Sequence, residues 1–291
     1  MCCLFLAASS TVAIAQTSVV DLVNPIIGTN GMGHTFPGAC VPFGLVQLSP
    51  DTDTIPHNVD GKYQPRSYEY CAGYQHKDSS IVGFSHTHFS GTGHSDLGDI
   101  LIMPTTGTLK LNPGTATNPD GGYRSRFSHG TEISRPGYYE VMLTDYGVKA
   151  QLTTTQRVGI HKYTYPTNSE NQRIILDMIH GIYNYDGKVL WTNIRVENDT
   201  LVTGYRITNG WARTNYTYFA MSFSKPITHY GCEEKAKVNY RGGYAKFNMK
   251  ENFPDIGGRK IVAYFDFDPK TPDELEVKVA LSGVSTEGAL K

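Results

Sequence analysis

The residues best suited to chemistry are concentrated in one short segment, GFSHTHFSGTGHSDLGD. Three of the ten histidines of the chain, His86, His88 and His94, fall there within nine residues. On an extended strand His86 and His88 would lie on one face, which is how two imidazoles reach the same metal ion or ligand. Asp96 and Asp99 follow closely and could orient an imidazole by a hydrogen bond.

The spacing in this segment allows three interpretations. In the first, His86, His88, His94 and Asp96 hold zinc or a similar ion, and the protein is a zinc hydrolase. In the second, the segment is a loop that binds a ligand or another protein, with glycines that allow close backbone approach. In the third, it is a polar loop at a domain edge whose histidines bond to backbone groups.

A second glycine-rich segment, GTNGMGHTFPGA, covers residues 28–39. It lacks the GxxxxGK[ST] spacing of a phosphate-binding loop, and no helical pattern follows it. A loop fixed by Pro37 and presenting Phe36 is suited to a sugar subsite, because an aromatic face packs well against apolar C–H groups. The alternative is that Phe36 is an ordinary core residue.

Other catalytic arrangements find little support in the sequence. There is no Gly-x-Ser-x-Gly motif, so a serine hydrolase of that type is not indicated. The carboxylates are scattered, and no two stand out as the acid and base of a glycosidase. We therefore assign no catalytic residue and no metal ligand from the sequence.

Composition narrows the class of protein. The 291 residues include 26 Lys+Arg and 27 Asp+Glu, for a net charge of -1, which removes the electrostatic case for nucleic-acid binding. No apolar run reaches the ~18–20 residues that a membrane-spanning helix needs. Residues 1–15 end in Ala-Ile-Ala and are predicted to be a signal peptide, so we expect a secreted or periplasmic protein. The three remaining cysteines allow at most one disulfide.

The elements that must position these segments are predicted to be strands. Asn-Gly and Asp-Gly pairs, which tolerate positive φ and close tight hairpins, separate runs of β-branched and aromatic residues. In the run Leu275 to Leu281 every second residue is apolar, which indicates one buried and one solvated face. The predicted strands are 138–144, 148–155, 158–165, 173–178, 189–196, 201–208, 216–224, 245–248, 261–267 and 275–281. This many strands without crossover helices predict an all-β antiparallel sandwich, preceded by a loop-rich stretch from 21 to 99.

A series of motifs in one order resembles the N-terminal part of glycoside hydrolase family 92, the calcium-dependent exo-α-mannosidases. The resemblance extends from about residue 21 to the last residue. The matching motifs are VNPIIGT (23–29), HTFPGA (34–39), VPFGLVQLSP (41–50), GY (73–74), IVGFSHTHFSGTG (81–93), GDILIMP (98–104) and VALSGVS (279–285).

The resemblance implies a β-sandwich of the galactose-mutarotase-like supersandwich type over residues 16–284. It also implies that residues 285–291 begin a linker to a C-terminal (α/α)₆ catalytic domain that is absent from this chain. In the family the active site lies between the two domains. A glutamic acid protonates the leaving oxygen, an aspartate activates water, and Ca²⁺ holds the mannose, so that α-mannosidic bonds in glycans are cut with inversion.

The resemblance also implies a role for the two glycine-rich segments as the sandwich's contribution to the sugar pocket. The expected substrate-binding residues are Phe36, Ser85, His86, Thr87, His88, Phe89, Ser90, Gly91 and Gly93. We expect an apolar patch near Phe36 and Phe89 where the catalytic domain would pack. Calcium ligands, acid and base are expected in that domain, so this chain alone should be inactive. The alternative is a stand-alone carbohydrate-binding or interaction module.

Overall fold

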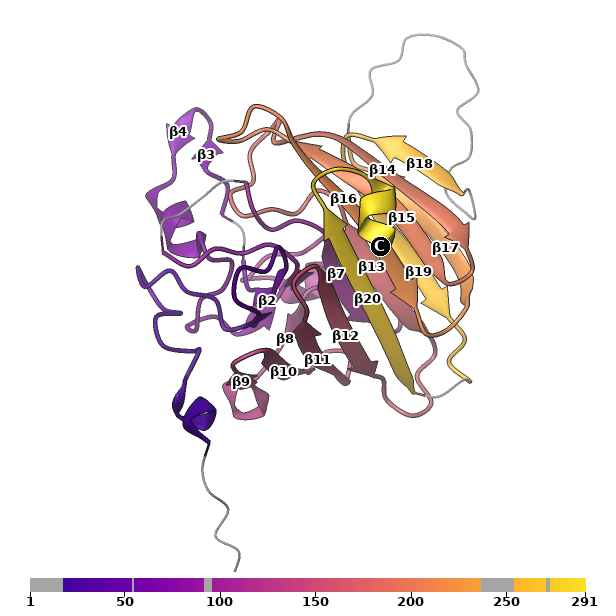
Figure 1. The fold of residues 1–291 in the computed structure, drawn as a ribbon, viewed down its shortest axis with the longest axis horizontal. Coiled ribbons are helices and arrows are strands. Elements are labelled where there is room, and N and C mark those ends of the chain that lie inside the picture. The colour runs from indigo at the N-terminus through magenta and orange to yellow at the C-terminus, as the bar shows by residue number, and fades with distance from the viewer. Residues whose placement is uncertain (1–17, 54, 92–95, 237–253, 271–272) are drawn as a thin grey trace, which may run out of the picture.

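A computed structural model describes residues 18–291, except residues 54, 92–95, 237–253 and 271–272. Two antiparallel sheets form the body of the molecule (Figure 1). The strand β20 (Glu274–Ser282) shows why the sequence builds a sheet here. Its residues Leu275, Val277 and Val279 are fully buried, whereas the residues between them are exposed or half-exposed. A chain with this period of two can bury its apolar face only as a strand that covers a core.

The larger sheet has nine strands, and each pair of neighbouring strands in it is antiparallel. Their order is β18 (Asp255–Gly258), β14 (Val189–Asn198), β15 (Leu201–Thr208), β16 (Asn215–Phe223), β20, β12 (Val158–Thr164), β11 (Val148–Thr154), β10 (Tyr138–Leu143) and β9 (Ile133–Arg135).

The smaller sheet has seven strands and combines segments that are far apart in the sequence. Their order is β1 (Ala39–Cys40), β2 (Gln47–Asp51), β6 (Gly83–Ser85), β7 (Leu101–Thr105), β13 (Gln172–Asp177), β19 (Ile261–Phe267) and β17 (Ile227–Glu234). Strands β7 and β13 are buried along their whole length. Both faces of this sheet are therefore covered at its centre, one by the nine-stranded sheet and the other by loops.

The remaining elements are short. They are the hairpin of β3 (Asn58–Val59) and β4 (Lys62–Tyr63), the pair β5 (Ser80–Ile81) and β8 (Ser125–Arg126), the 3₁₀ turns η1 (Val19–Leu22), η2 (Pro65–Tyr70), η3 (Pro119–Gly121) and η4 (His129–Thr131), and the helix α1 (Thr286–Leu290). Helix α1 is capped by Ser285, whose hydroxyl accepts a hydrogen bond from the Gly288 amide at 3.1 Å. It packs against β16 and β20. None of the helices among these residues is long and apolar enough to cross a membrane.

The core lies between the two sheets and is rich in aromatic residues. Phe223 of β16 packs against Phe265 and Phe267 of β19, with ring centroids 5.7 and 4.9 Å apart. Phe84 of β6 packs against Tyr163 of β12 at 6.3 Å. These contacts cross from one sheet to the other, so the predicted all-β sandwich is confirmed.

Nine of the ten predicted strands are confirmed, with ends that agree to within two residues. The tenth, at 245–248, lies outside the described residues. Strands β14 and β15 form an antiparallel hairpin, with Val196 opposite Val202. Strands β2 and β6 lie in the stretch that was predicted to be loop-rich. Both strands are short, and β2 contains Pro50, a residue that is unusual inside a strand. Because both are almost wholly buried, they also lack the alternation of apolar and polar residues that indicates a strand in the sequence.

The Asn-Gly and Asp-Gly pairs play more varied roles than predicted. Asp60 and Gly61 both have positive φ, 50° and 77°, and join β3 to β4 in a tight hairpin. Asp120-Gly121 instead falls within η3. Asn30-Gly31 and Asn209-Gly210 lie in longer loops, where they serve contacts rather than hairpins.

Candidate functional site

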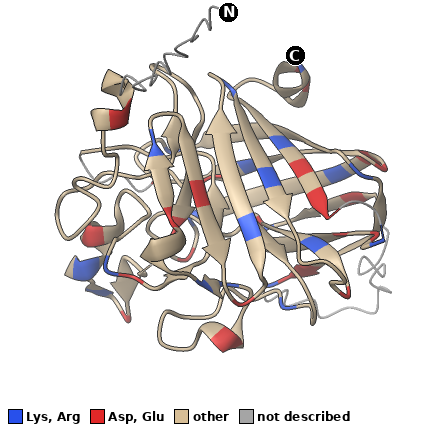
Figure 2. Ribbon diagram, turned by 90° about the horizontal axis from the view of Figure 1, so that it is seen from below, with Lys and Arg blue, Asp and Glu red and all other residues tan. Residues whose placement is uncertain are grey.

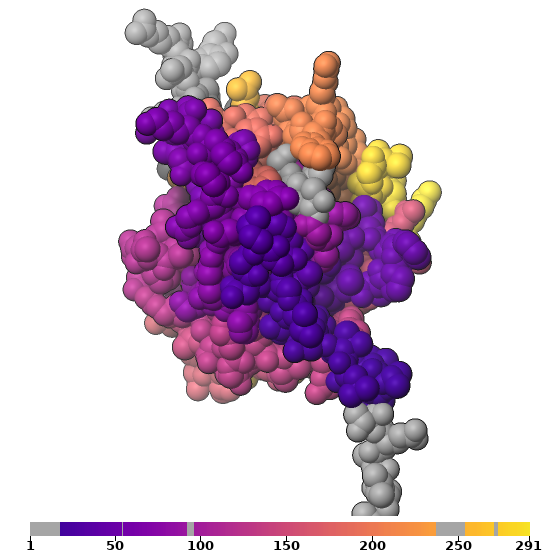
Figure 3. All heavy atoms as spheres, turned by 90° about the vertical axis from the view of Figure 1, so that its left-hand side faces the viewer, coloured from indigo at the N-terminus to yellow at the C-terminus, as the bar shows by residue number. Residues whose placement is uncertain are grey.

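The two glycine-rich segments meet at one end of the sandwich. His34, in the segment 28–39, bonds to the histidine-rich segment through both its backbone and its side chain. The His34 carbonyl accepts from the Gly91 amide at 2.8 Å, and His34 Nδ1 donates to the Gly91 carbonyl at 3.1 Å. His34 has a φ of 53°, and its ring packs edge-on against Tyr68, with centroids 4.7 Å apart. In the space-filling view of Figure 3 the early segments of the chain, coloured indigo and violet, lie together on this face.

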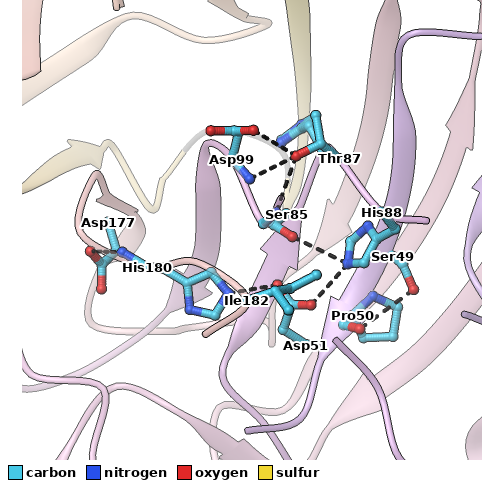
Figure 4. Close-up of polar contacts among 12 residues, drawn as sticks. Ser49, Pro50, Asp51, Ser85, Thr87, His88, Asp99, Asp177, His180 and Ile182 are labelled. Atoms are coloured by element: carbon cyan, nitrogen blue, oxygen red, sulfur yellow. Dashed lines mark hydrogen bonds and ion pairs between the residues drawn. The ribbon is translucent and has the colours of Figure 1, made fainter. Parts of the chain in front are cut away.

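A buried carboxylate lies beneath these loops. Asp51, the last residue of β2, has no exposed surface. Its two oxygens accept from different imidazoles: Oδ1 from His88 Nε2 and Oδ2 from His180 Nε2, both at 2.8 Å (Figure 4). Burial raises the pKa of Asp51, but the two imidazoles more than offset this effect, so that the pKa lies well below its usual range. Asp51 is therefore an anion that links three separate segments.

His88 is positioned as a donor on both sides of its ring. Its Nδ1 lies 2.8 Å from the carbonyl oxygen of Gln47, and its Nε2 lies 2.8 Å from Asp51. Both partners are acceptors, so the ring is held between a carbonyl oxygen and a carboxylate oxygen. Ser85 Oγ lies 3.2 Å from the same Nε2. In a Ser-His-Asp triad the serine and the aspartate bond to different nitrogens, so these three residues form a structural cluster.

The packing around Asp51 also explains a glycine in one of the matching motifs. Gly73 has a φ of +82°, and a Cβ placed on it would lie 2.0 Å from Asp51 Oδ1. A side chain at this position would collide with the carboxylate. Only glycine allows the backbone to approach so closely with this conformation.

His86 points to the other sheet. Its Nε2 lies 2.9 Å from His161 Nε2 on β12, and its Nδ1 donates to the Ile100 carbonyl at 2.6 Å. The hydroxyl of Tyr163 completes the series at 2.8 Å from His161 Nδ1. A consistent set of protons is Tyr163 O–H to His161, His161 N–H to His86, and His86 N–H to Ile100, with both imidazoles neutral. Desolvation lowers the pKa of His86 to about 4, and it also lowers that of His161.

A second buried ion pair holds the end of the histidine segment. Asp99 Oδ1 accepts from Arg206 at 2.6 Å (Nη2) and 3.0 Å (Nε), and Arg206 lies on β15. Asp99 Oδ2 accepts from the hydroxyl of Thr87 at 2.8 Å, and that hydroxyl in turn accepts from the amides of Gly98 and Asp99. Arg206 also donates to the carbonyl of His180. The ion pair thus joins the loops to the nine-stranded sheet.

The predicted substrate-binding residues divide into a buried and an exposed set. Ser85, His86, Thr87 and His88 are all less than 7% exposed and bond to protein groups. Phe89 is 53% exposed, Ser90 and Gly91 are exposed, and Phe36 is half-buried. The ring of Phe36 packs on that of His88, with centroids 5.4 Å apart. Gly93 lies outside the described residues.

The expectation that His86 and His88 share one face is wrong. Strand β6 ends at Ser85, and the two imidazoles bond to groups on opposite sides, His161 and Asp51. His94, the third ligand of the zinc interpretation, lies outside the described residues. Asp96 accepts from the backbone amides of Trp211 and Ala212 at 2.9 and 3.2 Å. The described members of that set therefore do not converge on one ion.

Three residues of this site, Asp51, His180 and Arg206, were not singled out from the sequence. The alternation in Leu201–Thr208 places Arg206 on the same face as Gly204 and Thr208, opposite the more apolar face, so the sequence favours a solvated Arg206. The structure instead buries this side chain, because Asp99 supplies a buried partner of opposite charge. Asp51 and His180 left no signal either, because each lies at or just beyond the end of a strand.

None of the described pockets is lined by two carboxyl groups that face each other. One pocket, of about 700 Å³, is lined by residues that include Asp186 and Lys260, and Asp186 is the one carboxylate in its lining. Others are lined by Asp21 or by Asp177 as the single acid. Inverting glycosidases need two carboxyl groups about 6.5–9.5 Å apart, which none of these hollows contains. Figure 2 shows acidic and basic residues interspersed along the strands.

Calcium takes six to eight oxygen ligands. The buried carboxylates Asp51 and Asp99 use their oxygens for imidazole, guanidinium and hydroxyl donors. Among the described residues one group, His76, His129 and Glu132, brings three possible metal-binding side chains together. Two nitrogens and one carboxylate do not suit calcium.

The sequence matches a known family profile and one named protein. Residues 22–282 match the sequence profile described as the glycosyl hydrolase family 92 N-terminal domain. A protein from Arthroderma benhamiae, named an uncharacterized secreted glycosidase, is 28% identical over 170 residues, which are 55% of this chain and 19% of that protein.

Solved structures are similar over nearly the whole chain. A family 92 α-mannosidase from Bacteroides thetaiotaomicron, solved with mannoimidazole, has a TM-score of 0.80 and 41% identity over 93% of this chain and 33% of its own. A family 92 inverting mannosidase from the same species has a TM-score of 0.71 and 26% identity over 94% of this chain and 33% of its own. The present chain thus spans about a third of the length of these enzymes.

The buried His86–His161 pair predicts a specific acid sensitivity. An unfolded histidine has a pKa of about 6.5, whereas His86 folded has a pKa of about 4. Between these values the unfolded chain binds a proton that the folded chain does not. The contribution to stability is thus complete above pH 6.5 and is lost as the pH falls, by about 2 kcal/mol at pH 5 from His86 alone.

The measurement is the free energy of unfolding as a function of pH. From pH 6.5 to 5, His86→Gln should make its slope shallower by about 1 kcal/mol per pH unit on average. His57→Gln, at an exposed histidine, should leave the slope unchanged. Equal slopes for the wild type and His86→Gln would show that His86 is protonated in the folded protein.

The Asp99–Arg206 pair predicts a large loss of stability when one partner is removed. Arg206→Met leaves the carboxylate of Asp99, 3% exposed, without its cation. Breaking a buried pair in this way costs about 3–5 kcal/mol. Arg195→Met is the control, because Arg195 is 58% exposed and pairs with acids at the surface, where less than about 1 kcal/mol is expected. Denaturant unfolding of both variants would measure the difference, and equal losses would contradict the assigned role.

Proposed function

The chain belongs to glycoside hydrolase family 92, as its N-terminal domain, and from this we propose that it forms the N-terminal part of a secreted α-mannosidase. In this proposal the enzyme hydrolyses α-mannosidic bonds in glycans with inversion and depends on calcium. The observation that carries the proposal is the similarity of the whole sandwich to a family 92 α-mannosidase, at a TM-score of 0.80 and 41% identity. Secretion is supported by the fungal relative that is named a secreted glycosidase.

The chain's own part in this function is to form one wall of the sugar pocket. Phe36, Phe89, Ser90 and Gly91 lie on the surface where the two glycine-rich segments meet. An exposed aromatic ring can pack against the apolar C–H face of a sugar. The buried residues Ser85 and His88 act from beneath, because their bonds to Asp51 and its neighbours fix the backbone that presents these groups.

The acid, the base and the calcium ligands are proposed to lie in a catalytic (α/α)₆ domain that packs on this one. Two observations support this division. The described hollows contain at most one carboxylate each, and no described group of residues fits calcium. Calcium bound there would hold mannose hydroxyls; this chain would supply the loops that exclude water and orient the sugar.

The proposed division between two domains predicts that this chain by itself is inactive. Incubated with an α-1,2-linked mannose disaccharide and Ca²⁺, it should release no mannose, because it lacks the pair of carboxyl groups that inversion requires. An α-mannosidase that releases mannose from the same disaccharide is the positive control. Clear turnover by the purified chain would refute the division of labour proposed here. Saturable mannoside binding by calorimetry, without turnover, would instead favour a stand-alone carbohydrate-binding module.

The second prediction concerns the exposed aromatic residue. Residues 22–282 of this chain are grafted in place of the matching segment of the Bacteroides thetaiotaomicron enzyme. In this chimera Phe89→Ala should lower kcat/KM for the disaccharide about tenfold, the value of one lost aromatic contact. Leu109→Ala is the control. Leu109 is also exposed, but it follows β7, whereas Phe89 and the rest of the histidine-rich segment precede that strand. If both variants keep full activity in a correctly folded chimera, Phe89 does not contact the sugar.

A further inference from the structure

A group of three potential metal ligands lies away from the buried Asp51 cluster. His76 lies in the loop between η2 and β5, His129 is the first residue of η4, and Glu132 directly follows η4. One ligand atom from each of the three lies within 4.8 Å of the others. Two loops more than fifty residues apart in the sequence thus bring two imidazoles and a carboxylate together.

The carboxylate of this group is held in place by two tyrosines. Tyr74 donates to both oxygens of Glu132, at 2.9 and 3.0 Å, and Tyr139 donates to Oε1 at 2.6 Å. Both tyrosines are buried, and the side chain of Glu132 is only 3% exposed. Carboxylates that bind metals are typically oriented by such outer hydrogen bonds. Glu132 is therefore fixed independently of the two histidines.

The imidazoles lie against each other beside this carboxylate. His129 Nδ1 lies 2.7 Å from Glu132 Oε2, and the rings of His76 and His129 are 3.9 Å apart at an angle of 32°. Nδ1 of His76 is buried and has no hydrogen-bond partner. An unpaired buried nitrogen is unfavourable. Coordination to a cation would satisfy it, because a neutral imidazole binds a metal through a ring-nitrogen lone pair.

We propose that His76, His129 and Glu132 form a binding site for a divalent transition metal ion, with zinc as the best match. Two imidazole nitrogens and one carboxylate oxygen are a ligand set that zinc takes in tetrahedral sites with a fourth position open to water. The side chain of His129 is 38% exposed, so an ion can enter from solvent. On binding, the metal would take the place of the hydrogen bond between His129 Nδ1 and Glu132 Oε2, with the proton of the neutral imidazole on Nε2.

The site would also fix the glycine-rich loop that carries Phe36. The amide of His76 donates to the carbonyl of Thr29 at 2.8 Å. The neighbouring side chain of Gln75 exchanges two hydrogen bonds with the backbone of Gly31, at 2.8 and 2.9 Å. A metal that holds His76 to His129 and Glu132 therefore ties this loop to the segment that leads into β9 and β10. The inferred role is a structural staple, independent of mannosidase activity.

The experiment uses the full chain, free of any histidine tag and stripped of metals with a chelator. Co²⁺ is the spectroscopic probe, because its visible d–d bands report tetrahedral coordination, and Zn²⁺ is titrated by calorimetry. We expect one equivalent of either ion to bind. His76→Ala and His129→Ala should each weaken binding at least roughly tenfold. His57→Ala, at an exposed histidine outside the group, should bind like the wild type.

Thiols are the main competing ligands, and Cys40 is exposed. Cys40→Ser should leave the binding unchanged, and the Co²⁺ spectrum should lack the intense near-ultraviolet bands of a cobalt–thiolate bond. As a second readout, Zn²⁺ should raise the thermal unfolding temperature of the wild type but not that of His76→Ala or His129→Ala. The proposal is overturned if the wild type shows no saturable Co²⁺ binding, or if His76→Ala and His129→Ala bind as tightly as the wild type.

Discussion

A buried carboxylate must be matched by donors wherever it lies, and Asp51 imposes this constraint on the loops of the molecule. With no exposed surface, it can remain an anion only because two imidazoles donate to it. Those imidazoles come from the segment after β6 and the segment after β13, while Asp51 itself ends β2. One ionised group thus holds together three segments that span about 130 positions of the sequence.

Two further polar contacts extend this constraint to the other sheet. The His86–His161 bond crosses the core from the end of β6 to β12, and the Asp99–Arg206 pair reaches β15. Each is buried, so each gains strength from the low dielectric around it and becomes costly if one member is missing. The segments beneath the exposed loop residues are thus bonded to both sheets, and such support is what one wall of a binding pocket requires.

The histidine-rich segment therefore has a role that its composition conceals. His86 and His88 resemble ligands in the sequence, but the structure uses them to build the interior, and the groups that face solvent are their neighbours Phe89, Ser90 and Gly91. Potential metal ligands meet elsewhere, at His76, His129 and Glu132. These three residues show no suggestive spacing as a set, since 53 positions separate the first two.

The sequence by itself determined the sandwich and the family. Alternating strands such as 275–281 can bury their apolar face in only one way, and an ordered series of motifs resembles the family to which the chain belongs. Only the tertiary structure decided which polar residues are buried and with whom they bond. The reason is that Asp51, His180 and Arg206 find their partners across distances of 37 to 129 positions. Local periodicity carries no information about such pairs, because the topology of the two sheets brings them together.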